Sequence, residues 1–213
     1  MNGNNVTDTN GHRDGILNAA IEVFGRVGYA AASTNEIVKL AKVSKGLLFH
    51  HFSNKENLYA ACQIHVMEKY GEYMMEHINL DSKDFFERIL YNLKMKLEFG
   101  RRHPEYLALI NRTWRIDDSE NTLDRKAMED YVIKSTLAGR QLVNFFEGVD
   151  TGCFREGIDV PKLLNYTRLI MEASWWRFSS ERGNDPELML KDIDDYLVEA
   201  EEILALLKYG AYN

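Results

Sequence analysis

The chain has 213 residues, 45% of them hydrophobic and 28% charged, which is the composition of an ordinary soluble globular protein. No apolar run is long enough to span a bilayer, and residues 1–11 lack the apolar core of a signal peptide, so we expect a cytoplasmic protein without membrane contact. The two cysteines, Cys62 and Cys153, are isolated in the sequence. Their spacing argues against a disulfide framework and against a C-x-x-C metal cluster.

The net charge of −7 is unevenly distributed along the chain. Residues 1–60 contain six Lys/Arg, five Asp/Glu and three His, whereas residues 61–213 contain twenty Lys/Arg and twenty-eight Asp/Glu. A nearly neutral N-terminal part on an acidic body suits a small DNA-contacting module, although the total charge alone argues weakly against nucleic-acid binding.

The N-terminal region predicts a tail and two helices. Residues 1–12 are polar and are expected to form a disordered tail, because they bury almost nothing. Arg13–Val27 has the period of an amphipathic helix, and Gly28 is expected to end it. Ser33 and Glu36 have capping-box spacing at the start of the second helix. The inward side chains expected of that second helix are Ile37, Leu40 and Ala41.

The stretch Lys45–Phe52 predicts a short helix with two unlike faces. At about 100° per residue, Leu48 and Phe52 share a core face, and Gly46 and His50 lie on the opposite face. Two lysines and two apolar side chains flank this outward face: Lys45, Leu47, Phe49 and Lys55. Three helices in this order are typical of a helix-turn-helix, and the outward face suits a DNA major groove.

Six further helices are expected after residue 52, and no segment has the alternation of a strand. They are Ser53–His77, with Ser53 and Glu56 as a capping box, Lys83–Phe99, Pro104–Ile116, Asn121–Val149, Pro161–Ser180 and Glu187–Lys208. The sequence therefore predicts an all-α fold of about nine helices.

The last helix carries a heptad pattern of apolar residues, spaced alternately by four and three residues. The pattern consists of Ile193, Leu197, Ala200, Leu204 and Leu207. The helix before it offers Leu163, Ile170 and Trp176. Two such helices from each of two chains would form a four-helix bundle, so we expect a homodimer through these residues. The alternative is that the heptad seam packs within one chain.

A series of residues in the first 60 positions matches a known pattern in order and spacing. They are Ile16, Ala20, Phe24, Gly28-Tyr29, Ser33-Thr34, Ile37, Ala41, Val43-Ser44-Lys45-Gly46, Phe49-His50-His51-Phe52 and Lys55-Glu56-Asn57-Leu58. This stretch resembles the N-terminal domain of TetR/AcrR-family transcriptional regulators. Residues 61–213 match that family only in the number and length of the helices.

The resemblance implies a homodimeric repressor of operator DNA. Residues 13–58 would form the helix-turn-helix DNA-binding domain. Residues 59–213 would form a helical domain for dimerisation and for a small apolar or amphipathic effector that releases the DNA. Carried onto this chain, the resemblance places DNA contacts at Thr34, Lys45, Gly46, Leu47, Phe49, His50, His51 and Lys55.

The chain departs from the family pattern at two of these positions. The family usually has Tyr where this chain has Phe49, and Phe cannot donate a hydrogen bond to a phosphate. Leu47 likewise replaces a small or hydroxylated residue. Both changes favour apolar contacts such as those with a thymine methyl, so we expect half-sites that contain A·T pairs.

Aromatic and Met side chains of the C-terminal helices are the candidates for effector binding, because such side chains adapt to varied apolar ligands. They are Met95, Phe99, Trp114, Phe145, Met171 and Trp175, and core packing is the alternative role for each. Of the adjacent Trp175 and Trp176, one is expected to face the interior and the other the dimer partner. Three arginines, Arg112, Arg115 and Arg168, are interpreted as surface ion pairs rather than an anion site.

Other functions receive less support from the sequence. His50 and His51 point about 100° apart on a helix and cannot easily share a metal ion, and we expect no metal or cofactor. His65, Glu68, Glu72 and Glu76 are interpreted as a solvated acidic face. The sequence lacks G-x-S-x-G, H-E-x-x-H and P-loop motifs, which argues against an enzyme. A helical protein-interaction adaptor that uses the Lys45–His51 surface is the remaining alternative.

Overall fold

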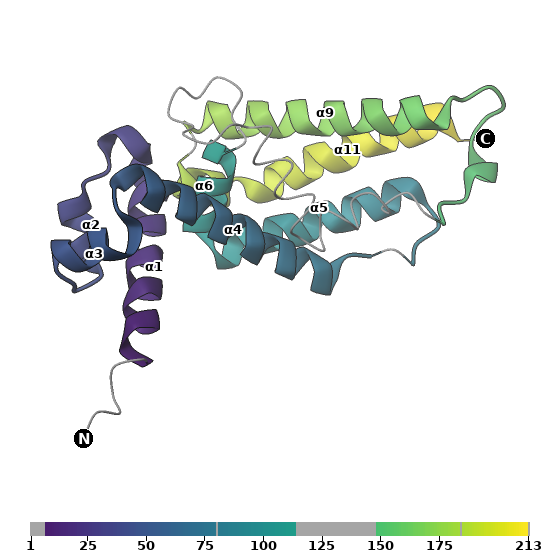
Figure 1. Ribbon diagram of the computed structural model, residues 1–213. Coiled ribbons are helices and arrows are strands. Elements are labelled where there is room, and N and C mark those ends of the chain that lie inside the picture. The colour runs from purple at the N-terminus through teal and green to yellow at the C-terminus, as the bar shows by residue number, and fades with distance from the viewer. Residues whose placement is uncertain (1–6, 80, 114–147, 184, 213) are drawn as a thin grey trace. The chain divides into compact units, whose positions relative to one another are not determined.

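The computed structural model describes residues 7–79, 81–113, 148–183 and 185–212 (Figure 1). Within these ranges the chain forms nine α-helices and one short 3-10 helix, and the only β-type pairing is an isolated bridge between Phe154 and Tyr212. The prediction of an all-α fold with about nine helices is confirmed. Among the described helices, none combines the length and the apolar composition needed to cross a membrane.

The described residues divide into two compact units. The first contains residues 7–70 and 103–113, and the second contains residues 71–102 and the described residues from 148 onward. Helix α4 (Lys55–His77) begins in the first unit and ends in the second. The other helices of the first unit are α1 (Thr7–Ala31), α2 (Thr34–Leu40), α3 (Lys45–Phe52) and α6 (Pro104–Thr113). The second unit contains α5 (Phe85–Arg102), η1 (Thr151–Cys153), α9 (Val160–Glu181), α10 (Pro186–Lys191) and α11 (Ile193–Ala211).

Helix α1 begins at Thr7, six residues before the predicted start at Arg13. Residues 7–12 are therefore helical rather than part of a disordered tail, and residues 1–6 lie outside the described residues. Residues added to an existing helix carry no new nucleation cost, so polar residues can extend it. Gly28 has φ 79° and ψ 172°, a conformation that interrupts the helix where the sequence predicted its end.

Serine side chains cap both short helices of the first unit. Ser33 Oγ accepts a hydrogen bond from the backbone N–H two residues later (3.3 Å), and Ser44 Oγ accepts one from the N–H of Leu47 (3.1 Å). The reciprocal half of the predicted capping box at Ser33 is absent from the described contacts. The Glu36 carboxylate instead forms an ion pair with Arg26 of α1.

Two local predictions in this region were wrong. Leu40 is 44% exposed, because α2 is only two turns long and buries a single side chain, Ile37. Helix α4 is capped by Asn54, whose Oδ1 accepts a hydrogen bond from the N–H of Asn57 (2.7 Å). Ser53, the predicted cap, has φ 62° and closes α3 instead.

Helix α6 packs directly on α1 within the first unit. The contact is closest at Gly25, where a Cβ atom would lie 2.7 Å from the backbone oxygen of Glu105. Arg112 Nε donates a hydrogen bond to the Gly25 carbonyl (3.4 Å). Gly25 therefore allows the two helix backbones to approach more closely than any larger residue would.

The second unit is a set of long helices in which α11 packs against both α5 and α9 (Figure 1). Asp84 caps α5, because its Oδ1 accepts hydrogen bonds from the N–H groups of Phe86 (2.9 Å) and Glu87 (3.1 Å). This cap moves the start of α5 two residues beyond the predicted Lys83. The core at this end of the unit consists of Phe85, Phe86, Phe154, Leu204 and Ala211.

The final helix was predicted as one segment from Glu187 to Lys208, but the structure has two helices that meet at Asp192. Asp185 begins the first of them and accepts hydrogen bonds from the N–H groups of Glu187 (2.8 Å) and Leu188 (3.2 Å). Helix α9 agrees with its prediction within one residue at each end. Most of the predicted helix Asn121–Val149, and the end of the predicted Pro104–Ile116, lie outside the described residues.

Candidate functional site

Helix α3 has one buried and one outward face, as the sequence predicted. Leu48 and Phe52 are 0% and 5% exposed and hold the helix to the first unit. Gly46 and His50 are exposed on the opposite face. Because Gly46 has no side chain, the surface of another molecule can approach the helix backbone closely there.

The side chains that flank this face differ in exposure. Lys45 is exposed, and its Nζ donates a hydrogen bond to Asn35 Oδ1 (3.0 Å) from the neighbouring helix. Leu47 and Phe49 are half-buried, so each presents part of its apolar surface outward. The outward face of α3 thus combines a cation, an imidazole and apolar groups on one short helix.

Lys55 and Thr34 occupy the edges of the same region. The Lys55 ammonium lies 4.6 Å from the centre of the Tyr29 ring and donates a hydrogen bond to the Ala30 carbonyl (3.4 Å). A lysine has three donors, so this placement leaves others for a phosphate. Thr34 is half-buried at the first turn of α2, and the cap is made by Ser33.

His50 and His51 differ in orientation. His51 is half-buried, and its Nε2 atom is buried without a hydrogen-bond partner among the described residues. Burial lowers the pKa of His51, and the nearby charges of His50, Arg13 and His12 lower it further. The buried Nε2 turns away from the outward face, so His50 is the better placed of the two for a DNA contact. Within the described ranges, no group of His, Cys, Asp and Glu has the arrangement of a metal site.

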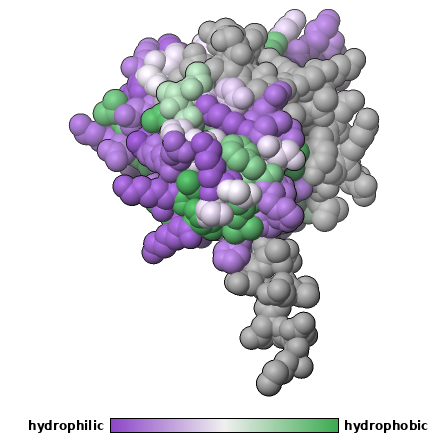
Figure 2. Space-filling model, turned by 60° about the vertical axis from the view of Figure 1, so that its left-hand side comes forward, coloured by the Kyte–Doolittle hydropathy of each residue, from purple (hydrophilic) through white to green (hydrophobic). Residues whose placement is uncertain are grey.

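The molecular face around these helices is mainly hydrophilic. Helices α2 and α3 lie on the left in Figure 1, and Figure 2 turns that side forward. Hydrophobic residues on this face gather in small patches surrounded by hydrophilic residues (Figure 2). Such a mixture is what a DNA-reading surface requires, because phosphates need polar donors and thymine methyls need apolar contacts.

The described candidates for effector binding all lie in the second unit. Phe99 is 2% exposed and contacts the ring of Tyr73, with the ring centres 5.3 Å apart. Met95 and Met171 are half-buried, and Met171 packs on the core of this unit. The remaining two candidates, Trp114 and Phe145, lie outside the described residues.

Trp175 lies in an aromatic cluster between helices α9 and α11. Its ring centre is 5.6 Å from that of Phe178 and 5.1 Å from that of Tyr196. The Nζ of Lys96 on α5 lies 4.6 Å from the centre of the Trp175 ring. Sequence reasoning missed Lys96, although it lies three residues after Leu93 and therefore on the apolar side of its helix.

A shallow cavity of about 290 Å³ lies in the first unit, apart from these candidates. It is lined by Asn18, Glu22, Glu105 and Tyr106. None of the predicted effector residues contributes to it. The cavity is therefore not the effector site that the sequence predicted.

The heptad seam proved to be an intrachain contact. Ile193, Ala200 and Leu204 are 1%, 0% and 3% exposed within the single chain, so their assignment to a dimer interface was wrong. A heptad spacing specifies that a helix packs on a neighbour and does not say whether the neighbour belongs to the same chain. Of the other candidates in these helices, Leu163, Leu197 and Leu207 are half-buried, and Ile170 and Trp176 are each 40% exposed.

Exposed apolar side chains instead lie on the outward sides of α9 and α11. Trp176 is exposed and Trp175 is half-buried, so Trp175 is the inward member of the pair, and the contact of Trp176 with a dimer partner stays a prediction. Exposed apolar side chains gathered on two helices that pack together often mark a protein–protein contact. The large side chains of this surface are Tyr166, Leu169, Ile170, Trp176, Val198, Leu206 and Tyr209.

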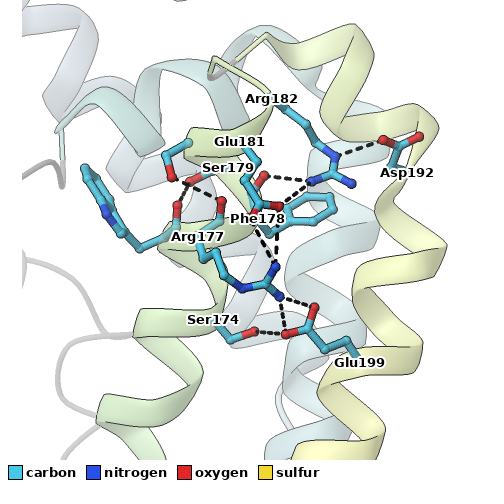
Figure 3. Close-up of polar contacts among 10 residues, drawn as sticks. Ser174, Arg177, Phe178, Ser179, Glu181, Arg182, Asp192 and Glu199 are labelled. Carbon is cyan, nitrogen blue, oxygen red and sulfur yellow. Dashed lines mark hydrogen bonds and ion pairs between the residues drawn. The ribbon is translucent and has the colours of Figure 1, made fainter.

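Charged groups join α9 to the helices beside it (Figure 3). Arg177 forms an ion pair with Glu199 of α11, and Ser174 Oγ donates a hydrogen bond to the same carboxylate (3.1 Å). Arg182 Nε donates to Asp192 (2.9 Å) at the junction of α10 and α11. These contacts fix the relative positions of the helices that carry the exposed apolar surface. Arg168 pairs with Glu172 (2.7 Å), which confirms the surface ion pair predicted for that arginine.

Comparison with known sequences finds that proteins similar to this chain are transcriptional regulators. Residues 16–62 match the family described as Bacterial regulatory proteins, tetR family. The HTH-type transcriptional regulator QacR of Staphylococcus aureus is 31% identical over 142 residues, which cover 62% of this chain and 74% of QacR. The HTH-type transcriptional repressor NicS of Pseudomonas putida is 26% identical over 189 residues, covering 89% of this chain and 85% of NicS.

Solved structures with the same fold include a TetR family transcriptional regulator from Chloroflexus aurantiacus. Its TM-score is 0.63, with 95% of this chain and 94% of that chain covered. The sequence identity is only 15%, so the likeness concerns the fold. It extends well beyond residues 16–62 and includes the helices of the second unit.

Proposed function

The chain belongs to the tetR family of bacterial regulatory proteins, and from this premise we propose that it is a DNA-binding transcriptional repressor released from its operator by a small-molecule effector. The observation that carries the proposal is the geometry of α3. Its core face is sealed by Leu48 and Phe52, and its other face presents Lys45, Gly46 and His50. NicS, which is similar over most of the chain, is named a transcriptional repressor.

The proposed DNA contacts are of two kinds. Lys45 and Lys55 would bind phosphates, which fix the position of the protein on the duplex. Gly46, Leu47, Phe49 and His50 would face the base edges in the major groove. Thr34 would lie near a phosphate at the start of α2, and His51 would contribute least, because its Nε2 atom is buried.

The protein is proposed to act as a homodimer. A recognition helix of two turns reads only a few base pairs, so a second half-site is needed for useful affinity and specificity. The exposed apolar surface of α9 and α11, which includes Ile170, Trp176 and Leu206, is the proposed interface. Operator DNA in a bacterium lies in the cytoplasm, which is where we place the protein.

The effector is proposed to bind in the second unit, among the described candidates Met95, Phe99, Met171 and Trp175. An effector that prefers one arrangement of the dimer would shift the population away from the operator-bound state. Helix α4 is a covalent link by which such a shift reaches α3, because it begins directly after α3 and continues into the second unit.

A mobility-shift assay with the full-length protein and DNA from upstream of its own gene tests the proposal. We expect a specific shifted band. At least one fraction of a metabolite mixture should reduce the intensity of that band. A protein-interaction adaptor, the less favoured alternative, would shift specific and shuffled DNA equally weakly. A shift that no small molecule affects would leave a DNA-binding protein but would contradict effector control.

A further inference from the structure

A single lysine lies on the apolar side of α5 in the second unit. Lys96 is half-buried, and its Nζ lies 4.6 Å from the centre of the Trp175 ring on α9. Trp175 in turn contacts Phe178 and Tyr196. The ammonium is thus placed beside an aromatic cluster, whereas most lysines extend their charge into solvent.

The ammonium of Lys96 has no hydrogen-bond acceptor among the residues that the structure describes. The carboxylate that raises the pKa of Lys96 belongs to Glu172. That carboxylate accepts a hydrogen bond from Arg168 (2.7 Å) and is largely exposed. Lys94, two residues earlier on the same helix, forms an ion pair with Glu201 (2.9 Å). One helix therefore carries a lysine paired with a carboxylate and a second lysine held mainly by an aromatic ring.

The surroundings of Lys96 favour an added anion. Burial lowers the pKa of Lys96 to about 8, and Glu172 offsets part of this effect. The group therefore remains mainly protonated at neutral pH. A lysine ammonium has three donors, and at this half-buried site none of them has an acceptor among the described residues. A carboxylate or sulfonate beside Nζ would supply those acceptors with a charge-assisted hydrogen bond.

We propose that Lys96 is the anion-binding residue of the effector site, and that the effector is an organic anion with an apolar body, such as a carboxylate or sulfonate. This inference rests on the proposed function, because it gives the chemical class of ligand for the same site. The anionic group would bind Nζ of Lys96. The apolar body would pack against Trp175, which is half-buried beside Phe178 and Tyr196.

A pair of fluorescent probes that differ only in charge tests this assignment. Anilinonaphthalene sulfonate carries an apolar body and a sulfonate, and phenylnaphthylamine has the same body without the anion. Their affinities would be measured by fluorescence titration of the full-length protein and of two variants, Lys96→Met and Lys94→Met. Met keeps the length and apolar stem of lysine and removes only the charge, and Lys94→Met is the matched control on the same helix.

We expect Lys96→Met to lower the affinity for the sulfonate probe about tenfold or more, because one charge-assisted hydrogen bond is lost. The affinity for the neutral probe should stay within about twofold of the wild-type value. Lys94→Met should change the affinity for neither probe. Lys96→Arg should retain most of the sulfonate affinity, because it keeps the cation. An equal loss for both probes, or no loss for the sulfonate, would overturn the assignment.

The same samples separate this inference from the proposed function. Circular dichroism melting establishes that each variant is folded, and Lys96→Gln replaces Lys96→Met if the latter is not. Operator binding is measured in parallel by mobility shift. Specific DNA binding without a Lys96-dependent probe effect overturns only the anion site. The expected probe effect in a protein that binds no specific DNA overturns only the repressor function.

Discussion

At the scale of single residues, the outward face of α3 is more apolar than a phosphate-reading surface requires. Leu47 and Phe49 are half-buried in the free protein, so part of each side chain remains available to a partner molecule. Lys45 and His50 supply the polar part of the same face. This mixture predicts that base contacts, and not only phosphate contacts, determine which DNA is bound.

Phe49→Tyr adds one hydroxyl to this face and separates two roles of the ring. If the ring edge lies beside a phosphate, the new O–H donates a hydrogen bond and the affinity rises about five- to tenfold for all sequences. If the ring touches a base, the sequence preference changes instead. We expect the change in preference, because Phe49 is partly exposed beside Gly46 and His50, which are exposed on the outward face of α3. Selection of bound sequences from a random DNA pool measures the preference of both proteins.

The half-buried imidazole of His51, whose Nε2 atom is buried, makes stability depend on pH. Its pKa is lowered in the folded state by burial and by nearby positive charges, so the unfolded chain binds the proton more readily. The stability that neutral His51 contributes is therefore complete above the unfolded pKa of about 6.5 and is lost as the pH falls toward the lower folded pKa. His65 is shifted in the same direction, mainly by burial.

Urea unfolding between pH 7.5 and pH 5.5, a range chosen to bracket the ordinary histidine pKa of about 6.5, checks this prediction. The free energy of unfolding should decrease with falling pH in the wild type and decrease less in His51→Gln. His50→Gln, at an exposed position, should keep most of the wild-type dependence. Identical pH dependence in the wild type and in His51→Gln would show that His51 titrates normally in the folded protein.

At the scale of helices, the contact of α1 with α6 depends on the absence of a side chain at Gly25. A Cβ there would lie 2.7 Å from the backbone oxygen of Glu105, a distance that requires the helices to separate. Gly15 lies on the same helix with no atom within 4 Å of the corresponding Cβ position. The two glycines therefore make a matched pair, one in a helix contact and one outside it.

Gly25→Ala should destabilise the protein by about 1–3 kcal/mol, because the backbone of α6 must move. Gly15→Ala should be neutral or stabilising by up to about 1 kcal/mol, since Ala is the better helix former. Thermal and urea unfolding of both variants provide the comparison. Equal stability of the two variants would mean that α1 and α6 can separate at little cost.

Local signals predicted the bounds of α3 well, whereas the choice between tertiary partners was predicted poorly. The bounds of α3 follow from the Ser44 cap and from the spacing of Leu48 and Phe52, all of which are visible in the sequence. The partner of Glu36 is not visible in the sequence. Arg26 and the backbone N–H of Ser33 compete for the Glu36 carboxylate, and only the fold decides between them. Lys96 was missed since a lone lysine in a helix is usually solvated.

At the scale of the whole molecule, the proposed function requires two copies of the chain. The buried seam of α11 is used within the chain, so the dimer must use other residues. Exposed apolar side chains on α9 and α11 supply such a surface, and the ion pairs of Arg177 and Arg182 hold these helices in place (Figure 3). The second unit, in which the effector is proposed to bind, is therefore also the part of the chain that we expect to set the oligomeric state.

Ile170→Arg places a charge in this surface and should convert the dimer to monomers, with a loss of at least about tenfold in operator affinity. Leu188→Arg is the control, because Leu188 is an equally exposed apolar residue on α10 (48%, against 40% for Ile170). Sedimentation velocity should give twice the chain mass of 24.7 kDa for the wild type and the control. A wild-type monomer, or a dimer that survives Ile170→Arg, would place the interface elsewhere.

Helix α3 is proposed to read a specific DNA sequence. The most direct test of this proposal is fluorescence anisotropy titration of the full-length protein with a labelled duplex from upstream of its own gene and with a shuffled duplex of equal composition. We predict that the natural duplex binds at least about 1,000-fold more tightly at physiological salt, and that His50→Ala removes most of this preference. Equal affinity for the two duplexes would contradict the account.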